Sequence, residues 1–222
     1  MDCRNGHVVL FDLDGVLADS RAAIAGCINH ALAAGGHALR PESDLHRFIG
    51  PPLPFAFAEL LGEPMESAAV ARCITRYRER YAVASLTETV VTPGIPDVLA
   101  RLATTHRLGV ATSKPRAFAE PLLEALGLRP HFDVVAGPEL STPTEDKTAT
   151  VAAALRALGA SGGAMVGDTA FDMVAAHAHG LRAIGVTWGI GGAEELLAAG
   201  AEALVAEPAE LPPALSPHAA RP

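Results

Sequence analysis

The chain has 222 residues, of which 50% are hydrophobic and 19% are charged, and its formal net charge is −8. A chain of this length and composition can bury a core of its own, which excludes an intrinsically disordered protein. The negative charge argues against nonspecific binding to nucleic acid, so no nucleic-acid partner is expected.

Neither a membrane span nor a secretory signal is predicted. No apolar run approaches the roughly 18 residues that a transmembrane helix needs, and the segment MDCRNGHVVLFD reaches acidic residues too soon for a signal peptide. Cys3, Cys27 and Cys73 lie far apart, so we expect reduced thiols. We therefore expect a cytoplasmic protein with no membrane partner. The sequence does not specify an oligomeric state.

The first predicted element is a strand over residues 8–11, VVLF, which is apolar enough to be buried on both faces in a parallel sheet. Side chains alternate along a strand, so Asp12 and Asp14 project to the same side if the extended geometry continues. Gly15 then permits a sharp change of direction. Two carboxylates this close repel each other unless one binds a proton or a cation lies between them. In the alternative interpretation, one aspartate caps a helix and the other lies in a turn.

Residues 20 to 86 carry helical patterns and no convincing strand. Ser20 is expected to be the N-cap of a first helix that ends at Gly35 and Gly36. Further helical patterns follow in SDLHRF, FAFAELLG and ESAAVARCITRYRERYAVASL. This part of the chain is predicted to be a helical insertion.

Two groups of residues within this insertion have more than one interpretation. The helically spaced Arg72, Arg76 and Arg80, with Tyr77 and Tyr81 nearby, could contact an anionic substrate, but a solvent-exposed helix face paired with Glu79 is favoured. Five apolar residues could line a lid over a site, although helical spacing favours packing for most of them; they are Phe48, Ile49, Leu53, Phe55 and Phe57.

From residue 87 onward, helical segments alternate with short apolar strands. The strand candidates are RLGVAT, FDVVAG, GAMVGD, RAIGVT and EALVA. This alternation predicts an α/β fold with a doubly wound parallel sheet and right-handed crossovers. We expect residues 1–17 and 87–222 to form the catalytic core, and residues 18–86 to form an inserted α-helical domain.

In open α/β sheets, ligands bind beyond the carboxyl ends of the strands. Four successive positions there carry Asp12 and Asp14, then Thr112 and Ser113, then Lys147, then Asp168 with Asp172 one helical turn later. Taken singly, a hydroxyl before a helix or Asp168 would read as a helix cap. Lys147 at a helix N-terminus opposes the helix dipole and needs an anion, which Glu145, Asp146 or a bound phosphate could supply.

Taken together, these residues indicate phosphoryl chemistry. Acidic oxygen ligands suit the hard cation Mg²⁺, which would also relieve the repulsion between the first two carboxylates. With Mg²⁺ bound, one aspartate can attack phosphorus while the other protonates the leaving oxygen. Two other patterns receive no catalytic role: His177 and His179 are read as exposed, and WGIGG is read as a turn into a helix.

The segments DLDGVLADS, VATSKP, Lys147 and VGDTAFD, in that order, resemble the four motifs of haloacid dehalogenase-like (HAD) phosphohydrolases over nearly the whole chain. FIGPPL, ATSKPRAFAEPLLEALGL and GVTWGIGGAEEL are similar to phosphoglycolate-phosphatase-like members. The helical insertion resembles a four-helix cap. The resemblance implies a Rossmann-like HAD core that hydrolyses a small phosphorylated metabolite with Mg²⁺ through an aspartyl-phosphate intermediate.

The resemblance also implies a role for each candidate. Asp12 would be the nucleophile, and Asp14 the general acid and later the base. The phosphoryl oxygens would be held by Thr112, the Ser113 backbone and Lys147. Mg²⁺ would be held by Asp12, the Asp14 backbone carbonyl and Asp168, and Asp172 would orient these ligands. One departure is Val16, because the first motif usually has threonine there.

Several alternatives remain open at this stage. A sugar phosphomutase shares the catalytic set and often has valine in the first motif, but such mutases resemble one another in a basic cap loop. Here the loop reads IGPPLP, with Arg47 just upstream, so hydrolysis is favoured. Asp14 argues against a dehalogenase. A phospho-receiver domain is shorter and has no helical insertion, and a catalytically silent phosphate-binding protein would not need every charged position.

Overall fold

The computed structural model describes residues 8–141 and 146–216. Its centre is a six-stranded parallel sheet with the strand order β5-β4-β1-β6-β7-β8. The strands are β1 (Val8–Phe11), β4 (Arg107–Ala111), β5 (Val134–Ala136), β6 (Ala164–Gly167), β7 (Arg182–Val186) and β8 (Ala203–Val205). Each lies within a segment that the apolar runs predicted, so the doubly wound parallel sheet is confirmed.

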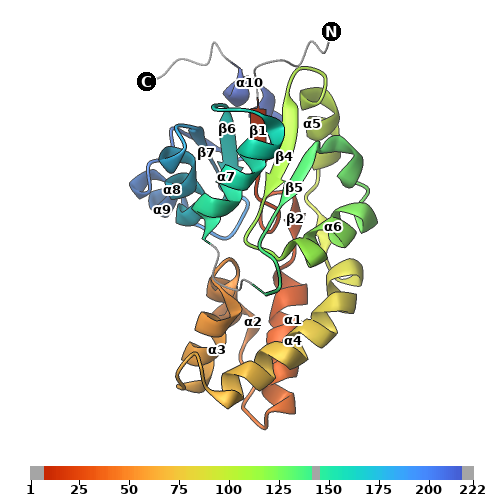
Figure 1. Cartoon of the computed structure of the whole chain (residues 1–222), viewed down its shortest axis with the longest axis vertical. Coiled ribbons are helices and arrows are strands. Elements are labelled where there is room, and N and C mark those ends of the chain that lie inside the picture. Colours follow the sequence, from red (N-terminus) through yellow and green to blue (C-terminus); the bar gives the residue numbers. More distant parts are fainter. Residues whose placement is uncertain (1–7, 142–145, 217–222) are drawn as a thin grey trace.

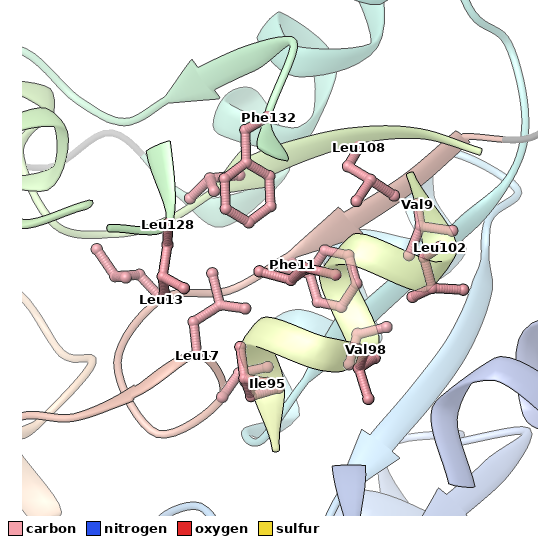
Figure 2. Close-up of a cluster of buried hydrophobic side chains, with 14 of the residues drawn as sticks. Val9, Phe11, Leu13, Leu17, Ile95, Val98, Leu102, Leu108, Leu128 and Phe132 are labelled. Carbon is pink, nitrogen blue, oxygen red and sulfur yellow. The ribbon is translucent and has the colours of Figure 1, made fainter. Parts of the chain in front are cut away.

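Alternate residues of β1 pack against different helices. Val9 and Phe11 belong to a cluster with α5 (Ile95–Leu102), α6 (Arg116–Ala125) and α10 (Leu211–Leu215), whereas Val8 and Leu10 pack with α7 (Lys147–Leu158), α8 (Ala170–Ala178) and α9 (Ala193–Ala198). Figure 2 shows Ile95, Val98 and Leu102 of α5 beside Val9 and Phe11. Because helices cover both faces, β1 is apolar along its whole length.

The helical insertion packs around a hydrophobic cluster of its own. The insertion contains α1 (Arg21–Ala34), α2 (Glu42–Leu45), the 3-10 turn η1 (His46–Phe48), α3 (Leu53–Leu61) and α4 (Ala68–Thr87). The cluster includes Ile28, Leu45, Phe57 and Tyr77, and Figure 1 shows these helices as a group below the sheet. The two segments that connect the helices of the insertion to the rest of the chain pair through a short antiparallel ladder of β2 (Ala18–Asp19) and β3 (Val90–Val91). Two-residue strands carry no periodicity, so this ladder was not predicted. The division of the chain at residues 18 and 86 stays a prediction.

Two simpler expectations concern membranes and thiols. No helix within residues 8–141 and 146–216 is long and apolar enough to cross a bilayer. Cys27 and Cys73 are free and buried, and Cys3 lies outside the described residues.

Candidate active site

Asp12 follows β1 directly and stays hydrogen-bonded to the neighbouring strand, because its N–H donates to the Val166 carbonyl of β6 at 2.9 Å. Gly15 then turns the chain with a φ of 84°. A side chain at position 15 would collide with Asp168, because a Cβ there would lie 2.0 Å from Oδ2 of that carboxylate. The first strand and the end of β6 therefore bring Asp12, Asp14 and Asp168 to one edge of the sheet, as the strand pattern predicted.

Lys147 is the cation of this cluster. Its Nζ lies 2.7 Å from Asp12 Oδ1 and 2.8 Å from Asp172 Oδ1, and only 5% of its side chain is exposed. Burial alone would lower the pKa of Lys147, but the charges of the two aspartates outweigh it and raise the pKa. The anion that the sequence required is thus supplied by the site itself. Asp146 instead caps α7 by accepting from Ala149 N–H at 2.8 Å, and Glu145 lies outside the described residues.

Asp172 orients the start of α8. Its Oδ2 accepts from the N–H groups of Asp168 and Thr169, at 3.2 and 3.0 Å, and from Thr169 Oγ at 2.9 Å. Thr169, and not Asp168, is therefore the N-cap of this helix. With its other oxygen on Lys147, Asp172 has both oxygens engaged within the protein.

Asp168 is held from the opposite side by the loop after β7. Its Oδ2 accepts from Ile190 N–H at 2.8 Å, and the Gly191 N–H donates to the Asp168 carbonyl at 3.0 Å. A Cβ on Gly189 would lie 2.3 Å from the Asp168 side chain, so the glycine permits this close approach. The WGIGG segment was interpreted only as a turn; its glycine spacing was the available signal for this contact.

The carboxylates are crowded enough to hold a cation. One oxygen each from Asp12, Asp168 and Asp172 lie within 4.8 Å of one another. Asp168 Oδ1 is buried and has no hydrogen-bond partner among the described residues. Burial, followed by the charges of neighbouring carboxylates, raises the pKa of Asp168 well above its ordinary value. The pKa of Asp12 rises to about 6, chiefly through burial, although Lys147 opposes the rise. Among these three carboxylates, Asp12 and Asp168 are the ones whose oxygens fit a hard cation, because those of Asp172 are already engaged.

Asp14 lies in different surroundings from Asp12. Ser20 Oγ donates to Asp14 Oδ1 at 2.5 Å, and Lys114 Nζ lies 2.8 Å from Asp14 Oδ2. Lys114 also donates to the hydroxyl of Tyr81, which α4 of the helical insertion contributes. Ser20 is the N-cap residue of α1, as expected, but its hydroxyl donates to Asp14 and not to the backbone of the helix. None of Ser20, Lys114 and Tyr81 was predicted as a site residue.

Thr112 and Ser113 follow β4 and line the same cavity as Asp12, Asp14 and Lys147. The Thr112 hydroxyl oxygen accepts from Lys114 N–H at 3.1 Å. Since that bond uses a lone pair, the hydroxyl proton remains available for an acceptor in the cavity. The structure therefore brings all seven predicted residues to one edge of the sheet.

The cavity has a volume of about 240 Å³ and lies between this edge and the helical insertion. Phe48, Ile49 and Leu53 line it, whereas Phe57 is fully buried among the helices and Phe55 is 49% exposed. The expectation that most of these residues pack within the insertion is confirmed, because Phe48, Ile49 and Phe57 belong to its hydrophobic cluster and Leu53 packs against it; three of the five also line the cavity. The arginine interpretation is confirmed for Arg76, which is exposed and pairs with Glu79 at 2.9 Å, whereas Arg80 pairs instead with Glu88 at 3.2 Å.

Comparison with known proteins shows similarity to one hydrolase family and to proteins named as phosphatases or nucleotidases. A family model described as haloacid dehalogenase-like hydrolase matches residues 9–186. A 5'-nucleotidase of Pseudomonas aeruginosa is 36% identical over 193 residues, covering 86% of this chain and 86% of that protein. A phosphoglycolate phosphatase of Cupriavidus necator is 34% identical over 218 residues, covering 94% and 93%. A crystal structure described as a predicted phosphatase from Clostridium acetobutylicum superposes with a TM-score of 0.86 at 34% identity, covering 92% of this chain and 95% of that chain.

Proposed function

The chain belongs to the haloacid dehalogenase-like hydrolase family, and from this premise we propose that it is a Mg²⁺-dependent phosphatase that hydrolyses a small phosphorylated metabolite through an aspartyl-phosphate intermediate. One observation carries the proposal most directly. Two carboxylates that leave the same strand have separate partners: Asp12 contacts Lys147, and Asp14 contacts Ser20 and Lys114. Carboxylates held in different surroundings are suited to different tasks.

The residues take the following parts in the reaction. A carboxylate oxygen of Asp12 attacks phosphorus, and Asp14 transfers a proton to the departing ester oxygen, which releases the alcohol. Asp14 then accepts a proton from water, and the water oxygen attacks the phosphorus of the aspartyl phosphate. The Asp12–phosphate bond breaks, so inorganic phosphate leaves and the carboxylate is restored.

The remaining residues hold the phosphoryl group and the cation. Lys147, the Thr112 hydroxyl and the Ser113 backbone bind phosphoryl oxygens. Asp12, Asp168 and the Asp14 backbone carbonyl would hold Mg²⁺, while Asp172 and Ile190 fix the direction of Asp168. Mg²⁺ at this position supplies positive charge that stabilises the transferring phosphoryl group. The helical insertion acts as a cap that closes the cavity and keeps bulk water away from the intermediate.

The test is phosphate release from a panel of phosphomonoesters that includes phosphoglycolate, nucleoside monophosphates and glucose phosphates, with Mg²⁺ and with a chelator. We expect release that requires Mg²⁺ and that Asp12→Asn abolishes while thermal unfolding shows a folded protein. Retained turnover in Asp12→Asn would contradict the nucleophile assignment. Absence of release from every ester in folded wild-type protein would contradict the proposed function, and exchange between sugar-phosphate isomers would then identify a phosphomutase.

A further inference from the structure

Among the described residues, the cavity wall contains one charged side chain that neither pairs with an opposite charge nor caps a helix. Of the charged residues that line the cavity, Asp12 pairs with Lys147, Asp14 pairs with Lys114, Glu139 pairs with Arg116, and Asp146 caps a helix. The remaining one is Arg78 of α4. Its Nε is buried and has no hydrogen-bond partner among the described residues, and no ion pair of Arg78 is found in that part of the chain.

The neighbours of Arg78 do not compensate this charge. Arg76 and Arg80, on the same helix, each have a glutamate partner, but Arg78 has none within residues 8–141 and 146–216. The cavity walls around it are largely apolar and aromatic. The buried Nε of Arg78 has no acceptor, which costs free energy, and the apolar surroundings strengthen the attraction of this side chain for an anion that enters the cavity.

A second donor lines the same cavity as Arg78. Tyr77 also lines the cavity, and its hydroxyl has no hydrogen bond to any described residue. Its ring is fixed between Phe57, with centroids 6.2 Å apart, and Tyr81, with centroids 5.2 Å apart. Because the ring is held on both sides, the hydroxyl is positioned before any ligand binds.

The position of this pair along α4 relates it to the leaving group. Tyr81 contacts Lys114, and Lys114 contacts Asp14, the proposed proton donor to the ester oxygen. Arg78 precedes Tyr81 by three residues, which is about 4.5 Å of helix rise. A leaving group at Asp14 therefore occupies the same cavity as Tyr77 and Arg78, which lie about one helical turn along α4 from Tyr81.

We propose that Arg78 and Tyr77 form a subsite for a second anionic group, a carboxylate or a phosphate, carried by the alcohol part of the substrate. Guanidinium nitrogens bind such groups through paired, charge-assisted hydrogen bonds, and the tyrosine hydroxyl adds a further donor. This inference rests on the proposed function, and it makes Arg78 a residue that selects among phosphomonoesters rather than one that takes part in phosphoryl transfer.

Three two-carbon phosphate esters test the subsite because they differ at the end remote from the ester. Phosphoglycolate carries a carboxylate, ethylene glycol bisphosphate a second phosphate, and 2-hydroxyethyl phosphate a neutral hydroxyl. We expect wild-type kcat/KM to favour at least one anionic ester over the neutral one by about 10- to 100-fold, the range of a hydrogen bond to a charged group. The anionic ester with the larger preference identifies the carboxylate or the phosphate as the group recognised.

Variants of α4 then show which side chains are responsible for the preference. Arg78→Ala should reduce the ratio of anionic to neutral kcat/KM by about 10-fold or more, Arg78→Lys should retain part of it, and Tyr77→Phe should lower it while keeping the ring. Arg76→Ala is the matched control, because Arg76 is 58% exposed, pairs with Glu79 and does not line the cavity; its ratio should equal that of wild type. A wild-type enzyme without the preference, or an unchanged ratio in Arg78→Ala and Arg78→Lys, would overturn the proposal.

A binding experiment separates this inference from the proposed function. The Asp12→Asn protein, titrated calorimetrically with phosphoglycolate, ethylene glycol bisphosphate and 2-hydroxyethyl phosphate, should bind at least one of the two anionic esters more tightly, and Arg78→Ala in the same background should remove the difference. If wild-type protein hydrolyses none of the esters, the proposed function fails. The subsite then stands on this binding difference, and equal binding of all three esters would refute it.

Discussion

Replacement of Gly189 by alanine tests the geometry that holds Asp168 at the site. The added Cβ would lie 2.3 Å from both Cβ and Oδ2 of Asp168, far inside normal contact distance. Asp168 is 0% exposed, so it cannot move outward without displacing its neighbours. The variant must therefore shift either the carboxylate or the loop that donates the Ile190 N–H to it.

The magnitude follows from this overlap. Inserting a methyl group into a packed site costs about 1–3 kcal/mol, and for a chain of this length each kcal/mol lowers Tm by about 2–4 °C. We expect Gly189→Ala to lower Tm by about 2–12 °C. Because Asp168 is a proposed Mg²⁺ ligand, its displacement should also raise the Mg²⁺ concentration for half-maximal rate by about 10- to 100-fold.

Gly192→Ala is the matched control in the same loop. A Cβ there meets nothing within 4 Å, and its φ of −79° and ψ of 154° suit alanine. Because Gly192 is the N-cap residue of α9 and alanine caps less well than glycine, we expect a loss of stability of up to about 1 kcal/mol and an unaltered Mg²⁺ requirement. Thermal unfolding in a chelator and phosphate release over a Mg²⁺ titration measure both quantities. If Gly189→Ala behaved as Gly192→Ala does in both assays, the described loop geometry would be wrong; a lower Tm with an unchanged Mg²⁺ requirement would show that Asp168 is not a ligand.

Two further predictions concern the two carboxylates after β1. In metal-free protein the pKa of Asp12 is raised from 3.8 to about 6. The contribution of the protonated carboxyl to folding stability is therefore fully present below pH 3.8 and is lost as pH rises through about 6. Wild type should therefore lose about 2 kcal/mol of unfolding free energy relative to Asp12→Asn between pH 4 and 7; denaturant titrations in chelator measure this, and parallel pH courses would contradict it. Ser20→Ala removes the donor 2.5 Å from Asp14 Oδ1, and the loss of this hydrogen bond should lower kcat about 10-fold with little change in KM. An unchanged kcat would show that Asp14 does not depend on this contact for its position.

Much of the site could be predicted because its residues directly follow strands. A parallel sheet brings the carboxyl ends of its strands to one edge, so a pattern that predicts β1, β4 and β6 also brings Asp12, Thr112 and Asp168 together. Asp172 follows Asp168 by four residues, and this helical spacing by itself predicts that the two side chains lie on the same face. These are local properties of apolar periodicity and spacing, and the sequence by itself determined them.

The partners of these residues were decided only by the tertiary structure. Ser20 is the N-cap residue of α1, as expected, yet its hydroxyl donates to Asp14 across the turn at Gly15. Tyr81 and Ile190 reach the site from segments 33 residues from Lys114 and 22 residues from Asp168, respectively. Periodicity indicates which face of an element is buried, but it does not indicate which distant side chain packs against that face.

The unpaired Arg78 shows the same limit most clearly. In the sequence it is one of several arginines on a polar helix, and only the packing of α4 against the core distinguishes it from the paired Arg76 and Arg80. Whether a charge finds a partner depends on what lies within a few ångströms in space, and that is set by the closure of the helical insertion over the edge of the sheet. The sequence determined the edge and its carboxylates; the fold decided the cavity above them, because its walls come from segments far apart in the chain.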